Sequence, residues 1–246
     1  MAKADVLKRL LTGPFAHCGI RWGLTGTVPK ADYEFMGLKC SIGDVSNRIQ
    51  ASELQDKGVL ANCHVNVLQT QDHPQFKTYA EELKWLTTDK TRMKWVANTI
   101  KDISSSGNTL ILVDRISAGE ILEEQIDDAV FVSGATKNTD RKEQYDEIST
   151  ATNKVIIATY GVAAVGINIP RIFNLVLIEP GKSFVRVIQS IGRGIRKAED
   201  KDSVQIWDIT SSCKFAKRHL GARKKFYKEA NYPYNIEKIN YENPYT

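Results

Sequence analysis

The stretch "TLILVD", residues 109–114, is an unbroken apolar run that ends in an acid. A strand with one face in water alternates apolar and polar side chains, whereas a strand buried on both faces does not. "KVIIAT" at residues 154–159 and "FNLVLIE" at residues 173–179 lack alternation in the same way. These three runs therefore predict strands in the interior of a sheet that is covered on both sides.

Further strands and helices are expected to alternate around these runs. Strands are predicted at "HVNVLQT" (64–70), "AVFVSG" (129–134) and "SVQIWDI" (203–209), and helices at 74–86, 90–104, 117–126 and 139–149. The last helix starts within "NTDRKE", residues 138–143, which is rich in capping residues. Strands that alternate with helices indicate an α/β fold, a parallel sheet with helices on both faces.

The first 60 residues differ from the rest of the chain. "CGIRWGLTGT", residues 18–27, predicts a strand that runs into a turn. The residues from 28 to 60 hold no second complete β-α-β unit. We therefore expect residues 1–57 to be the end of one domain and residues 58–246 to form a full domain.

The composition is that of an ordinary globular protein, and the cysteines lead us to expect a cytoplasmic one. It has 246 residues, of which 42% are hydrophobic and 26% charged, and no apolar run approaches the roughly 20 residues that cross a bilayer. Cys18, Cys40, Cys63 and Cys213 form no C-x-x-C pair. We expect reduced thiols and no metal site.

A second feature is a basic stripe near the C-terminus. At about 100° per residue, six cations fall within an arc of about 120° on one helix: Lys214, Lys217, Arg218, Lys224, Lys225 and Lys228. A one-sided basic stripe can follow nucleic-acid phosphates, and a solvated helix face is an equally good interpretation. Gly221 is a candidate break in this helix.

"QSIGRGIRK", residues 189–197, places Arg193 and Arg196 three residues apart. On a helix this spacing puts both guanidinium groups on one face, where they can reach one phosphate. Neighbouring glycines allow another surface to approach closely. The alternative is a surface helix whose arginines pair with carboxylates.

The chain lacks the rest of a nucleotide-hydrolysis site. "PGKS" at residues 180–183 ends like a phosphate-binding loop, but G-x-x-x-x-G-K-[ST] would need glycine where Val176 stands. No Asp-Glu pair closes an apolar strand to hold magnesium. We therefore expect no ATP hydrolysis by this chain alone.

Four segments together resemble superfamily-two helicases. "IIATYGVAAVGINIP" (156–170) and "QSIGRGIRK" (189–197) resemble motifs V and VI, "LTGT" (24–27) resembles motif III, and "TLILVDRI" (109–116) resembles motif IV. Their order and spacing agree with that family. The pattern is most similar to the UvsW-type DNA helicases of T-even bacteriophages.

The resemblance implies two RecA-like domains with ATP and Mg²⁺ between them. Residues 1–57 would be the tail end of the first RecA-like domain plus a linker, and residues 58–246 the second. ATP and Mg²⁺ would be bound mainly by the missing first domain, in cis or in trans. DNA, single-stranded or branched, is the implied partner, and DNA repair and recombination are the implied processes.

The resemblance also implies roles for single residues. Arg193 and Arg196 would be arginine fingers on the γ-phosphate, held in place by Gln189. Gly166 and Asn168 would lie near the nucleotide.

Other residues would contact DNA or couple the two domains. Thr159 and the Ser133-Gly134 turn would grip DNA phosphates without reading sequence, although 133–134 could equally be a tight turn. Thr25 and Thr27 would couple nucleotide state to domain closure, or form a plain turn.

The sequence is compatible with three functions. The first is the C-terminal motor portion of an ATP-dependent DNA helicase or translocase. The second is a non-catalytic nucleic-acid-binding or regulatory module. The third is one half of a split helicase whose other half is a separate chain.

Overall fold

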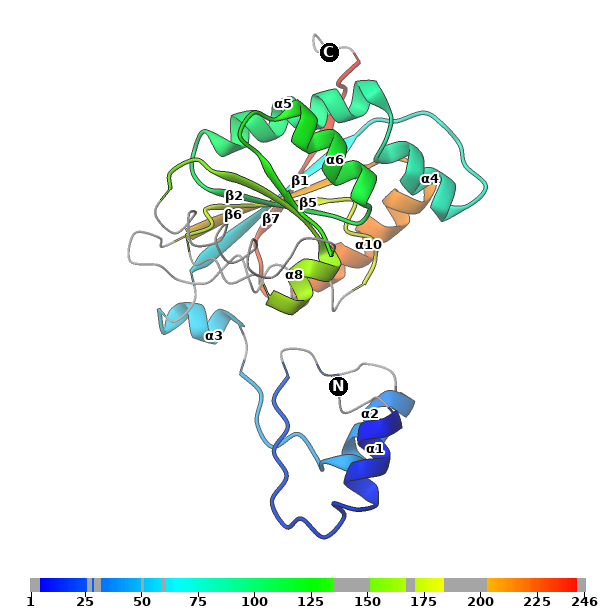
Figure 1. Ribbon diagram of the computed structural model, residues 1–246, viewed down its shortest axis with the longest axis vertical. Coiled ribbons are helices and arrows are strands. Elements are labelled where there is room, and N and C mark those ends of the chain that lie inside the picture. Colours follow the sequence, from blue (N-terminus) through cyan, green and yellow to red (C-terminus); the bar gives the residue numbers. More distant parts are fainter. Residues whose placement is uncertain are drawn as a thin grey trace. The chain divides into compact units, whose positions relative to one another are not determined.

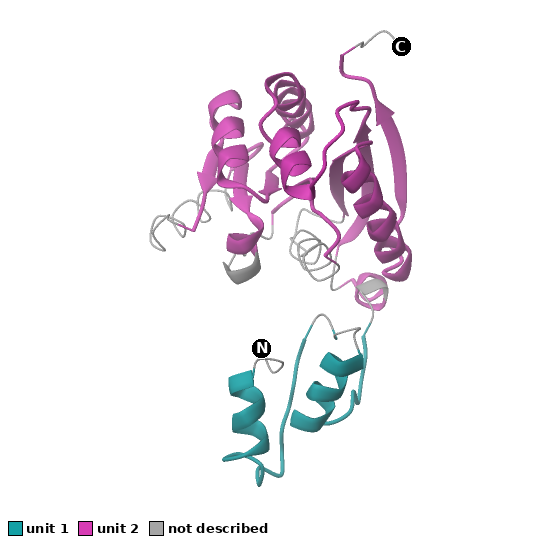
Figure 2. Ribbon diagram, turned by 90° about the vertical axis from the view of Figure 1, so that its right-hand side faces the viewer, with its two compact units in different colours: residues 1–50 teal, residues 51–246 magenta. Residues whose placement is uncertain are grey.

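The computed structural model describes residues 5–25, 28, 32–49, 51–58, 61–134, 151–166, 171–183 and 203–242. It divides into two compact units, Met1–Gln50 and Ala51–Thr246 (Figure 2). The helix expected at 139–149 and the stretch 189–197 lie outside the described residues.

The second unit is built on one sheet in which every pair of neighbouring strands is parallel (Figure 1). The strand order is β3-β4-β2-β5-β6-β1-β7. The strands are β1 (Asn62–Thr70), β2 (Thr109–Val113), β3 (Val130–Val132), β4 (Val155–Thr159), β5 (Asn174–Ile178), β6 (Ser203–Ser211) and β7 (Tyr234–Ile239). The parallel α/β sheet predicted from the sequence is confirmed. Strand β7 was not predicted.

Helices cover both faces of this sheet, as expected. The unit contains α3 (Ala51–Asp56), α4 (Tyr79–Leu86), α5 (Lys90–Ser104), α6 (Ile116–Gln125), α8 (Tyr160–Gly166) and α10 (Lys214–Glu229). Figure 1 shows α5 and α6 on one side of the sheet and α8 and α10 on the other.

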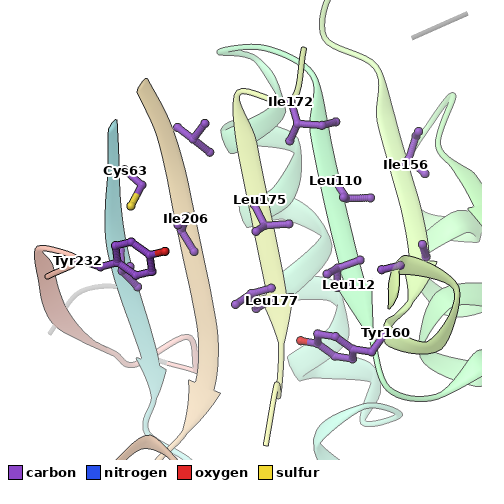
Figure 3. Packing of buried hydrophobic residues seen from close by; sticks show 14 of the residues in the cluster. Cys63, Leu110, Leu112, Ile156, Tyr160, Ile172, Leu175, Leu177, Ile206 and Tyr232 are labelled. Atoms are coloured by element: carbon purple, nitrogen blue, oxygen red, sulfur yellow. The ribbon is translucent and has the colours of Figure 1, made fainter. Parts of the chain in front are cut away.

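Alternate side chains of each inner strand enter two separate cores. In β2, Ile111 and Val113 pack in one core with Met93 and Val96 of α5. Leu110 and Leu112 point to the opposite face, where the second core contains apolar residues of α8 and α10 (Figure 3). Because both faces are buried, these strands carry no polar alternation.

Two helix predictions needed correction. Helix α4 begins at Tyr79 and not at Pro74, because Thr78 and Glu81 form a capping box: the Thr78 hydroxyl accepts from the Glu81 amide, and the Glu81 carboxylate accepts from the Thr78 amide. Helix α10 runs through Gly221 without a break. Buried residues on both sides, Leu220 and Arg223, hold it to the sheet.

The first unit contains α1 (Asp5–Thr12) and α2 (Asp32–Ser41). The strand expected at 18–27 is wrong for residues 18–25, which have no regular structure. A strand needs a neighbour for its backbone groups, and the described part of this unit provides no other strand.

Apolar side chains of the first unit remain exposed. Ile20, Trp22 and Leu24 are 80%, 86% and 95% exposed, and no apolar side chain in the described part of this unit is buried. Arg21 bridges the backbone, donating to the carbonyls of Leu11 and Ser41 at 3.0 Å each.

Within the described ranges of both units, no helix has the length and apolar character of a membrane span. All four cysteines are free thiols.

Candidate nucleotide and nucleic-acid site at the carboxyl edge of the sheet

Ligands of open parallel sheets bind beyond the carboxyl ends of the strands. Val132 of β3 is in register with Ala158 of β4. Ser133 follows the end of β3 and Thr159 is the last residue of β4, so the structure brings together two of the residues predicted to contact DNA. Gly134 follows, with open space where a Cβ would stand.

The Thr159 hydroxyl takes part in the transition from β4 to α8. It accepts a hydrogen bond from the Val162 amide at 3.4 Å, which is long for such a bond. Thr159 is half-buried. Its hydroxyl can therefore orient the first turn of α8 and still donate its own hydrogen to another acceptor.

The residues predicted to contact nucleotide fall mostly outside the described part of the chain. Gly166 is the last residue of α8. Asn168, Gln189, Arg193 and Arg196 lie outside the described residues, and so does Thr27. Thr25 is exposed in the first unit.

The basic stripe forms the outer face of α10. Lys225 and Lys228 are exposed and Lys224 is half-buried, while Ala216, Leu220, Arg223 and Tyr227 form the buried face. Helix α10 packs on β6, which is separated from β4 by β2 and β5. At about 4.8 Å per strand, the two strands are about 14 Å apart. Lys224 and Lys225 thus form a group separate from Thr159 and Ser133.

Sequence reasoning missed a buried charged network at the same edge. Arg223 of α10 is completely buried and makes a two-pronged ion pair with Asp208 of β6, with N–O distances of 2.8 and 2.9 Å. Its Nη1 donates to the carbonyl of Gly181 at 2.7 Å. The Tyr227 hydroxyl donates to Asp208 at 2.8 Å.

A second buried arginine, Arg92 of α5, completes the network. Its Nη2 donates to Glu179 Oε1 at 2.8 Å, and its Nη1 donates to the Leu86 carbonyl. The Thr210 hydroxyl donates to Glu179 Oε2 at 3.2 Å. Arg92 Nε lies 3.5 Å from Asp72 Oδ2.

Asp72 is held by hydroxyl groups. It accepts hydrogen bonds from Thr70, Ser211 and Tyr241, each at 2.6 Å.

Burial raises the pKa of Glu179 to about 7, against the attraction of Arg92 and Arg223 and with further repulsion from Asp208 and Asp72. His219 is affected in the opposite sense. Burial, followed by Arg223, Arg218 and Lys182, lowers its pKa to about 4, so it is neutral near pH 7.

A signal for this network existed in the sequence. Arg92 lies four residues before Val96 and eight before Ile100, on the apolar stripe of α5. Arg223 lies between Leu220 and Tyr227 on the apolar stripe of α10. A charged residue that helical periodicity places on the buried face of a helix indicates a buried ion pair.

The raised pKa of Glu179 makes a prediction about stability. Because its folded-state pKa lies above the ordinary value of about 4.3, the folded state favours the protonated form. The protein should lose stability as the pH rises from about 4.3 to about 7, by up to about 1.4 kcal/mol per pH unit from this group. Glu179→Gln should abolish this slope, as measured by urea unfolding between pH 5 and 8. Parallel slopes for the two proteins would show that Glu179 is ionised throughout.

Comparison with known proteins shows similarity to helicases. Residues 91–198 match the helicase conserved C-terminal domain. The chain is 26% identical over 237 residues to the ATP-dependent DNA helicase uvsW of Enterobacteria phage T4, an alignment that covers 92% of this chain and 47% of that helicase. The chain thus spans about half the length of this relative.

Solved structures show the same fold. The crystal structure of T4 UvsW superposes with a TM-score of 0.63 at 21% identity, covering 84% of this chain and 45% of that one. A fragment of a putative HsdR subunit of a type I restriction enzyme from Vibrio vulnificus YJ016 gives a TM-score of 0.69 at 18% identity, covering 89% of this chain and 44% of that one. Residues 91–198 therefore carry the helicase conserved C-terminal domain, the sheet is RecA-like, and the chain is similar to UvsW of phage T4.

Proposed function

We propose that this chain is the C-terminal motor portion of an ATP-dependent DNA helicase or translocase that acts in the cytoplasm. The observation that carries the proposal is the helicase C-terminal domain match over residues 91–198, a range that contains the stretches resembling motifs IV, V and VI. The chain supplies the arginines that contact the γ-phosphate of ATP and the residues that contact the DNA backbone. A first RecA-like domain, in cis or in trans, supplies the phosphate loop.

The nucleotide part of the site needs groups from both domains. Arg193 and Arg196 would neutralise charge that develops on the phosphate oxygens, which accelerates phosphoryl transfer about 10³- to 10⁵-fold in other systems. Gln189 would hold these arginines, and Gly166 and Asn168 would line the nucleotide. The described residues contain no group of three or more His, Cys, Asp or Glu able to hold a metal ion. The first domain would bind the metal.

The first unit supports a role in a larger assembly. Ile20, Trp22 and Leu24 expose most of their apolar surface, which is unusual in a complete domain. Residues 1–50 would contribute to the core of the first RecA-like domain. Thr25 and Thr27 would then couple nucleotide state to domain closure.

The proposal predicts ATP hydrolysis only after reconstitution. The purified chain should show no DNA-stimulated ATPase activity, since it lacks the phosphate loop. Fusion to, or mixing with, the first RecA-like domain of a UvsW-type helicase should produce DNA-dependent hydrolysis above that of either part, measured by phosphate release. Turnover by the repurified chain alone would contradict the proposal. DNA binding without any reconstituted turnover would favour a non-catalytic binding module.

The exposed basic face of α10 predicts weak, salt-dependent binding of single-stranded DNA without sequence preference. Each phosphate neutralised contributes about −0.7 to the slope of log K against log salt for single strands. Lys224→Glu with Lys225→Glu should weaken binding at low salt and make that slope shallower, as measured by fluorescence anisotropy. Lys94→Glu with Lys101→Glu, on exposed positions of α5, makes the same charge change on the opposite face. Equal losses for both pairs would show a general charge effect and no binding surface on α10.

A further inference from the structure

The turn that follows β5, Glu179-Pro180-Gly181, has an unusual backbone. Glu179 has a φ angle of 42° and Gly181 a φ angle of 72°. Glycine adopts positive φ readily, whereas a glutamate there is strained. Strained residues persist where the surrounding structure holds them, and they cluster at functional sites.

Two guanidinium groups hold this turn from opposite faces of the sheet. Arg92 of α5 binds the Glu179 carboxylate at 2.8 Å, and Arg223 of α10 binds the Gly181 carbonyl at 2.7 Å. The Glu179 amide also donates to the Ile209 carbonyl of β6 at 3.0 Å. The first residue of the turn is therefore fixed by its side chain and amide, and the last by its carbonyl.

Stability alone is a poor explanation for this arrangement. Removing two guanidinium groups and their carboxylates from water is costly, and apolar replacements of buried ion clusters are often neutral or stabilising. What the network does provide is a fixed backbone at the carboxyl end of a central strand, where ligands of such sheets bind. Groups that act on a ligand must be held within about 0.5 Å of their working positions.

The geometry points to Arg223 as a positioning residue that, with Glu179, fixes the turn from which the chain continues to Arg193 and Arg196. The inference rests on the proposed function of those two arginines. Arg223 touches neither nucleotide nor DNA in this scheme. It acts through the Gly181 carbonyl, while Asp208 and Tyr227 hold its guanidinium group in place.

A variant that replaces Arg223 together with its two partners tests whether Arg223 holds the turn in place. Arg223→Met, Asp208→Leu and Tyr227→Phe combined leave no unpaired buried charge, so the fold should persist. In the purified chain, amide hydrogen exchange across residues 179–183 should become at least about tenfold faster in this triple variant. Arg218→Met, an exposed arginine of the same helix, should leave it unchanged. Unchanged exchange in the triple variant would overturn the inference.

Steady-state kinetics then distinguish a positioning role in catalysis from a purely structural role of the network. In the enzyme reconstituted with a first RecA-like domain, the triple variant should lower kcat about tenfold or more with little change in KM for ATP, because a misplacement near 1 Å can cost about 100-fold in rate. Arg223→Lys should behave similarly, since lysine lacks the fork that serves Asp208 and Gly181 together. If the triple variant does not fold, Arg223→Lys undergoes both measurements, with the same direction expected.

The outcomes distinguish this inference from the function on which it rests. Faster exchange with normal kcat, in an enzyme that Arg193→Ala inactivates, would show that the network is only structural. An Arg193→Ala variant with normal turnover would instead contradict the proposed arginine fingers. Faster exchange together with reduced kcat supports the positioning role.

Discussion

Replacing Arg193 or Arg196 by lysine in the reconstituted two-domain enzyme is expected to lower kcat about 100-fold or more, with a much smaller change in KM for ATP. A contact made chiefly in the transition state affects turnover more than substrate binding. Lysine keeps the charge but lacks the planar fork that holds two phosphate oxygens at once. Arginine fingers contribute about 10³- to 10⁵-fold in other enzymes, and a loss of about 100-fold is the smallest that we expect here.

Steady-state kinetics at saturating DNA measure this effect, with circular dichroism as the test of folding. Arg218→Lys provides the matched control, because Arg218 is exposed on α10 and should tolerate the change. Near-normal kcat in both Arg193→Lys and Arg196→Lys would contradict the proposed role. It would favour the alternative, in which the two arginines lie on a surface helix and pair with carboxylates.

Asp208→Asn is expected to destabilise the second unit by about 3–5 kcal/mol, since it leaves the Arg223 guanidinium buried without its countercharge. The side chains of both residues are completely buried, so water cannot replace the lost partner. Urea unfolding measures the loss as a lower midpoint at unchanged slope.

Asp102→Asn is the control for this substitution. Asp102 is exposed near the end of α5, so its replacement should change stability by no more than about 0.5 kcal/mol. A loss below about 1 kcal/mol for Asp208→Asn would mean that solvent reaches Arg223 and that the pair contributes as a surface ion pair does.

The inner strands could be predicted from the sequence because burial on both faces leaves a direct mark. The runs at β2, β4 and β5 carry only apolar or small side chains through their centres. Strand β7 left no such mark, because four of its residues, Asn235 to Lys238, are exposed. Its place in the sheet depends on pairing with β1, which is a property of the fold.

The candidate site was predictable in part for the same reason. Thr159 ends one recognisable strand and Ser133 follows another, so their position at one edge of the sheet follows from parallel topology. Arg92 and Arg223 were not identified, because a charged residue is ordinarily a surface residue and the composition of a helix does not show which partner it meets. The strand expected at 18–27 is wrong over residues 18–25, because a strand depends on its neighbours as much as on its own side chains.

The position of β1 in the sheet has a consequence for biosynthesis. Its two neighbours, β6 and β7, are the last strands in the described part of the chain, and the carbonyl of Thr70 in β1 accepts from the amide of Ser212, 142 residues further on. A ribosome that adds about 5–20 residues per second needs about 7–28 s to cover that interval. Throughout it, Val65 and Val67, which are 0% exposed in the folded protein, have no strand to pair with. The nascent chain should therefore recruit holding chaperones through β1, and synthesis that stops before β6 should leave a polypeptide prone to aggregation and degradation.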